Sequence, residues 1–182
     1  NTGVRENTMP PVLRMDDYTP QARVYWWATT FLGATALALA VANVGERDIA
    51  FALQIAGGAA IAALTGLFPV RLPGTKTSLA GAELFVFLLL LVYGPAAATI
   101  AAAAEAAVGS FRTSKRWTSR IASPALAALA MYGCGSVFVV AMSAARNGAG
   151  PSNAILFAAI FALAIAYFTC NTLLMASLRS KE

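Results

Sequence analysis

Six apolar segments, separated by short polar ones, make up most of this chain. They cover residues 24–44, 49–70, 79–93, 95–111, 121–145 and 154–178, between a polar tail at 1–23 and a polar segment that begins at 179–182. An α-helix rises about 1.5 Å per residue, so roughly 20 apolar residues cross the ~30 Å hydrocarbon core of a bilayer. The pattern predicts an all-α fold, a polytopic transmembrane helical bundle with six spans.

The count of six depends on the dipeptide Gly94-Pro95, which divides the 33-residue stretch 79–111. As one helix that stretch would be about 50 Å long, which exceeds the hydrocarbon core. Proline inside a helix costs about 3 kcal/mol or more, and the preceding glycine adds backbone freedom. The sequence therefore predicts a hairpin of two short spans that turns at Gly94-Pro95.

The basic residues predict the orientation of these spans, because cytoplasmic loops of membrane proteins carry an excess of Lys and Arg. With the N-terminus in the cytoplasm, eleven of the 13 basic residues fall on the cytoplasmic side, and only Arg47 and Arg146 fall outside. Without the Gly94-Pro95 turn, the basic cluster at 112–120 would lie outside. The chain is therefore predicted to be a multi-pass membrane protein with both termini in the cytoplasm.

Composition supports this reading and excludes several classes of function. The chain is 59% hydrophobic and 12% charged, whereas a soluble domain carries about 25% charged residues. The net charge of +5 resides in short loops, which fits membrane topology better than a nucleic-acid partner. Histidine is absent, and no phosphate-binding loop or nucleophile–base pair is present. We therefore expect neither an enzyme nor a cofactor. Because the chain begins with Asn1, we expect it to be part of a longer polypeptide.

Two carboxylates, Glu83 and Glu105, lie inside the predicted spans. The hairpin places them at nearly equal depth, in the cytoplasmic third of the bilayer. Charges in a bilayer are costly, so they face the protein interior or water and have a partner. The two groups could share a proton, coordinate a cation or an amine ligand, or form structural ion pairs with Arg71, Arg112, Arg116 or Arg120.

Two amides are also predicted to lie within the spans, Gln54 and Asn171, and each is expected to bond to a neighbouring helix. Asn171 lies roughly level with the glutamates. The candidate ligand-binding residues are Glu83, Glu105, Asn171 and Arg71, for a small molecule that the sequence does not identify.

Small residues recur every fourth position at 34, 38 and 42 and again at 98, 102 and 106, and such stripes allow helices to approach closely. They indicate packing, and we expect a homodimer or a subunit of a larger membrane complex.

Cys134 and Cys170 are inferred to lie at different depths, which argues against a bond between them. Both are interpreted as small buried hydrophobic residues.

A motif in the middle of the chain resembles a known family. Phe68-Pro69-Val70-Arg71-Leu72-Pro73-Gly74 and Ser78-Leu79-Ala80 lead into a span ending Tyr93-Gly94-Pro95, and Tyr167-Phe168-Thr169-Cys170-Asn171-Thr172-Leu173-Leu174 comes near the end. The pattern, over about 49–178, resembles the integral-membrane MASE sensor domains that precede bacterial GGDEF and HD-GYP proteins of cyclic di-GMP signalling. Where such domains often have an Asn-Ala pair at the start of the fifth span, this chain has Ser123-Pro124-Ala125.

The resemblance implies a sensory input module in a bacterial inner membrane, whose catalytic output domain lies outside this chain. Two other functions fit the sequence. The substrate-binding S-components of vitamin transporters are six-span proteins of similar size with a Pro/Gly-rich loop before a span that ends in Gly-Pro, although their hairpin comes one span earlier. The third possibility is a small accessory subunit of a larger membrane assembly.

Overall fold

The chain folds into α-helices, and the structure, a computed structural model, describes residues 20–65, 67, 70–71, 78–79, 82–114, 116–146 and 153–179. In order, the elements are α1 (Pro20–Gly45), α2 (Ile49–Thr65), β1 (Val70–Arg71), β2 (Ser78–Leu79), α3 (Ala82–Tyr93), α4 (Pro95–Thr113), α5 (Trp117–Arg146) and α6 (Asn153–Arg179). The predicted all-α class is confirmed, with six helices in the described part of the chain. The polar tail at 1–19 and residues 180–182 lie outside the described residues.

The region between α2 and α3 differs most from the prediction. The second apolar segment was expected to stay helical to residue 70, but α2 ends at Thr65 and is followed by the strand pair β1–β2. This pair is antiparallel, with Val70 opposite Leu79 and Arg71 opposite Ser78. Helix α3 therefore has only 12 residues, a length of about 18 Å.

The helix break at Gly94 is present as predicted. Gly94 has φ 90°, a conformation that residues with a Cβ atom rarely adopt, and it separates α3 from α4. Pro95 occupies the first turn of α4, where its missing N–H would have had no helical partner. The same rule explains why α1 begins at Pro20, four residues before the predicted span.

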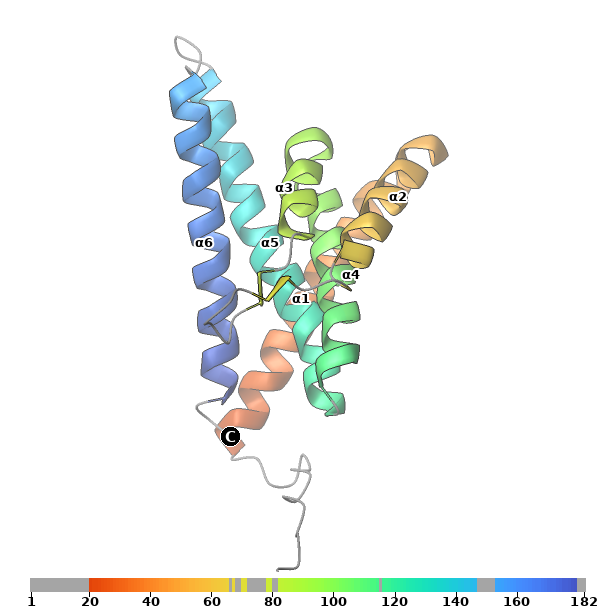
Figure 1. The fold of residues 1–182 in the computed structure, drawn as a ribbon, viewed down its shortest axis with the longest axis vertical. Helices are drawn as coiled ribbons and strands as arrows, with labels where there is room; N and C mark the ends of the chain where they lie inside the picture. The colour runs from red at the N-terminus through yellow and green to blue at the C-terminus, as the bar shows by residue number, and fades with distance from the viewer. Residues whose placement is uncertain are drawn as a thin grey trace, which may run out of the picture.

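Helices α4 and α5 form the centre of the bundle (Figure 1). Helix α4 packs on α1, α2, α3 and α5, and helix α5 also packs on α1. Helix α6, in blue, lies along the outer side of α5, with only light contact to α1. The two central helices therefore each contact several others, whereas α6 is attached mainly to α5.

Small residues allow the central helices to approach closely. Ala98 and Ala102 of α4 are fully buried, so their predicted stripe packs inside the bundle. At the crossing of α1 and α5, a Cβ atom on Gly33 would lie 2.1 Å from the carbonyl oxygen of Ala125, so glycine is required there. The other stripe, at positions 34, 38 and 42 of α1, is exposed.

Within the described residues, two helical stretches are long and apolar enough to cross a membrane, Arg23–Gly45 and Trp117–Ala144. The apolar stretches Ile49–Thr65, Glu83–Tyr93 and Phe157–Leu173 are shorter. These lengths and compositions suggest association with a membrane.

Candidate functional site

The two predicted glutamates lie on α3 and α4, which pack against each other. Glu83 lies in the first turn of α3 and Glu105 in the middle of α4, at equal distances in sequence from the Gly94 turn. Both side chains are half-buried. Their carboxyl groups lie close enough for their charges to interact. The chain therefore folds so that two acidic groups share one region of a mostly apolar interior.

Tyr167 of α6 completes this cluster, although the sequence analysis did not select it as a site residue. Its side chain is only 6% exposed, and it interacts electrostatically with both Glu105 and Glu83. Its ring packs edge-on against Phe87 of α3, with 6.0 Å between the ring centroids. Tyr167 precedes Asn171 by four residues, a spacing that places both on one helical face and that could have indicated it.

Asn171 is only partly exposed, and its side-chain oxygen is buried without a hydrogen-bond partner among the described residues. An unsatisfied buried polar group costs about 1–3 kcal/mol. Gln54 was also expected to be a buried amide, but it is exposed on α2. Its oxygen accepts a hydrogen bond from the Tyr93 hydroxyl at 3.3 Å. The predicted bond to a neighbouring helix is confirmed for Gln54. The Asn171 oxygen forms no such hydrogen bond with any residue that the structure describes.

Two of the four arginines considered as partners of the glutamates, Arg112 and Arg120, bind elsewhere. Arg112 donates to the backbone carbonyl of Leu67, and Arg120 Nε donates to the carbonyl of Ser114 at 2.8 Å. Arg71 lies in β1, and its side chain is outside the described part of the chain. No ion pair joins Glu83 or Glu105 to any residue that the structure describes.

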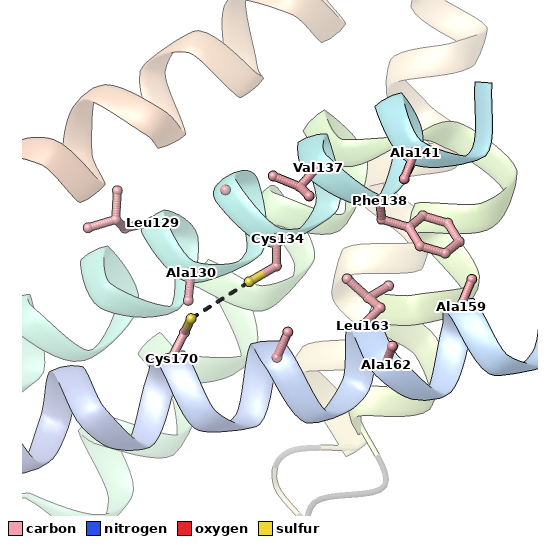
Figure 2. Close-up of a pocket in the computed structure, with 12 residues that line it drawn as sticks. Leu129, Ala130, Cys134, Val137, Phe138, Ala141, Ala159, Ala162, Leu163 and Cys170 are labelled. Atoms are coloured by element: carbon pink, nitrogen blue, oxygen red, sulfur yellow. Dashed lines mark hydrogen bonds between the residues drawn. The ribbon is translucent and has the colours of Figure 1, made fainter. Parts of the chain in front are cut away.

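The two cysteines lie together, which contradicts the predicted difference in depth. Cys134 Sγ is 3.9 Å from Cys170 Sγ, and both thiols are free (Figure 2). Cys170 is exposed rather than buried, so the interpretation as a buried hydrophobic residue is wrong for it. Depth was inferred by counting along each span, which assumes that the connected ends of α5 and α6 lie at the same level, but α6 is displaced along α5 so that the two cysteines meet.

An apolar groove of about 560 Å³ runs between α5 and α6 beside this thiol pair. Its twelve lining residues, with no charged side chain among them, are Leu129, Ala130, Gly133, Cys134, Val137, Phe138, Ala141, Ala159, Ala162, Leu163, Ala166 and Cys170. Figure 2 shows Phe138 and Leu163 directed into the space between the two helices.

Comparison of the chain with protein-family models, with curated proteins and with solved structures finds no match. The functional argument therefore rests on the fold and on the residues of the cluster.

Proposed function

We propose that this chain is a multi-pass membrane domain that binds a small cationic ligand and transmits the binding event through α6, as the sensory input module of a bacterial signalling protein. The observation that carries the proposal is the cluster of Glu83, Glu105 and Tyr167. Its two acidic groups have no cationic partner among the described residues. Tyr167 belongs to α6, the helix that is attached mainly to a single neighbour.

The surface of the bundle supports a membrane location. Large hydrophobic side chains on every helix face outward, and Phe31 of α1, Leu84 of α3, Val137 of α5 and Phe161 of α6 are each about 70% exposed. A soluble protein rarely exposes apolar surface over all its elements, because each exposed patch is costly in water. In hydrocarbon the same surface is favourable. The proposed topology has six membrane segments and both termini in the cytoplasm.

The short helix α3 supports a ligand site at the glutamates. A helix of 12 residues crosses only part of a bilayer, and an extended strand pair precedes it. Non-helical backbone at membrane depth is tolerated where it is buried in protein or lines a polar cavity. Interrupted membrane helices of this kind are also where transporters bind their ligands and ions. Glu83, in the first turn of α3, lies at such an interruption.

The chemistry of the cluster favours a cation. Two nearby carboxylates attract positive charge, and the rings of Tyr167 and Phe87 offer the aromatic surface that organic ammonium ions prefer. The unpaired oxygen of Asn171 adds an acceptor one helical turn away. A ligand that bound α3, α4 and α6 together would favour one position of α6 over others, which is the differential binding that a signal requires.

The binding part of the proposal is tested with the purified chain and a panel of amines that includes ethanolamine, choline and spermidine. A binding amine raises the unfolding temperature of the wild type but not that of Glu105→Gln. The matched control, Glu46→Gln, changes an exposed carboxylate in the turn between α1 and α2 and should respond like the wild type. Equal shifts in all three proteins, or none in any, would overturn the site.

The signalling part is tested with spin labels on exposed positions of α6 and α1, Phe161→Cys and Val41→Cys, with both native cysteines changed to serine. The distance between the labels should change when the binding amine is added. An unchanged distance between the labels would overturn the proposed sensory function. In that case, co-purification with an energising transport module would favour the S-component-like alternative, and co-purification with one large complex would favour an accessory subunit.

A further inference from the structure

The thiol pair of Cys134 and Cys170 lies beside the proposed ligand site but includes none of its residues. From the position of Cys134 and Cys170 we infer that they form a reversible modification site, in which a membrane-soluble quinone oxidises the two thiols to a disulfide that ties α6 to α5.

Proximity is the first support. The two Sγ atoms lie 3.9 Å apart on adjacent antiparallel helices, both free, whereas bonded sulfur atoms lie about 2 Å apart. A movement of about 2 Å shared between two side chains closes that gap. Helix α6 packs mainly on α5, so few other contacts resist a small adjustment of its position.

The surroundings select the oxidant. The pair lies at the edge of the α5–α6 groove, whose other lining residues are apolar, and Cys170 is exposed on the outer surface (Figure 2). In the proposed membrane location that surface faces lipid. A charged oxidant such as glutathione disulfide does not partition into such a groove, whereas an uncharged quinone does. The aromatic ring of Phe138 and the small alanines beside it leave an apolar space for a quinone ring.

The reaction balances without any further reagent. Both S–H bonds break, one S–S bond forms, and the two thiols together give up two electrons and two protons. The quinone takes up these two electrons and two protons and becomes a hydroquinone. A dithiol reductant reverses the change, because thiolate attack on either sulfur reopens the disulfide.

The expected consequence concerns α6. Tyr167 lies one turn before Cys170 on this helix, so the thiol pair lies close to the polar cluster. A covalent link at this point holds α6 against α5 next to the polar cluster. Oxidation would therefore restrict the movement of α6 whether or not an amine binds there.

The test uses the full chain in liposomes treated with tetramethylbenzoquinone, whose fully substituted ring cannot be alkylated by a thiol. After denaturation, neither cysteine of the wild type should react with a polyethylene-glycol maleimide. The protein should remain monomeric, and its mass should be lower by two hydrogens. Dithiothreitol should restore both sites. Glutathione disulfide should leave both thiols reactive.

The matched control moves one thiol to another face of α6 while keeping two cysteines in the chain. Phe168→Cys combined with Cys170→Ser places the second thiol on an exposed position two residues away. This variant should keep both maleimide sites under the quinone. Retention of both sites in the wild type, disulfide-linked dimers as the only product, or equal oxidation by glutathione disulfide would each overturn the inference.

Discussion

The two sides of α5 are packed in different ways. On one side α1 and α4 approach so closely that Gly33 meets the backbone of Ala125, and Ala98 of α4 is fully buried. On the other side α6 leaves a groove of about 560 Å³, and Gly133 of α5 has open space where a side chain would be. Tight packing resists a change of position, so the α1–α4–α5 side is suited to be a scaffold and α6 to be the part that moves.

The largest effect is expected from adding a methyl group on the tight side. The added carbon in Gly33→Ala would lie 2.1 Å from the Ala125 carbonyl oxygen, and backbone cannot move aside as a flexible side chain can. Separating α1 from α5 should cost about 3 kcal/mol, measured as loss of unfolding free energy in detergent. Gly133→Ala is the matched control, because nothing lies within 4 Å of its new carbon, and it should be neutral or slightly stabilising. Equal losses in both variants would remove the contrast between the two sides.

The same contrast should appear when alanine is enlarged. Ala98→Leu forces a large side chain into a fully buried position of α4 and should destabilise the fold by about 2 kcal/mol. Ala166→Leu places the same side chain in the α5–α6 groove, where it should change the free energy of unfolding by less than about 0.5 kcal/mol. A loss for Ala166→Leu as large as that for Ala98→Leu would show that the groove closes in solution.

A smaller effect is expected at the glutamates. Each of Glu83→Gln and Glu105→Gln relieves the burial of one carboxylate and its repulsion by the other, so each should stabilise the ligand-free protein, and the double variant should gain less than the sum of the two single gains. The coupling should be about 1 kcal/mol in a double-mutant cycle of unfolding free energies. Glu46→Gln combined with Glu83→Gln serves as the additive control. Additive behaviour of the Glu83–Glu105 pair would mean that the two groups do not interact.

Local sequence was sufficient to predict the helices and the turn on which the hairpin depends. Apolar runs bounded by polar residues predicted six helices, because the pattern of apolar and polar residues along a helix is a local property of the sequence. The helix breaks at Gly94, as the dipeptide Gly94-Pro95 predicted. The pairing of Glu83 with Glu105 followed from that one turn. Local sequence also held the signal that ends α2 at Thr65, because Gly66 follows the helix directly and Pro69 comes three residues later. The apolar character of residues 66–70 led instead to the prediction of a longer helix.

Only the tertiary structure revealed how α6 lies against its neighbours. The meeting of Cys134 with Cys170, the approach of Tyr167 to the glutamates and the unpaired oxygen of Asn171 all depend on where α6 sits along α5. That position is set by the packing of side chains distant in sequence, so counting residues along each helix gave the wrong relative depth for the cysteines. Periodicity and turn chemistry are local properties and could be read from the chain, whereas the position of one helix against another is a property of the assembled bundle.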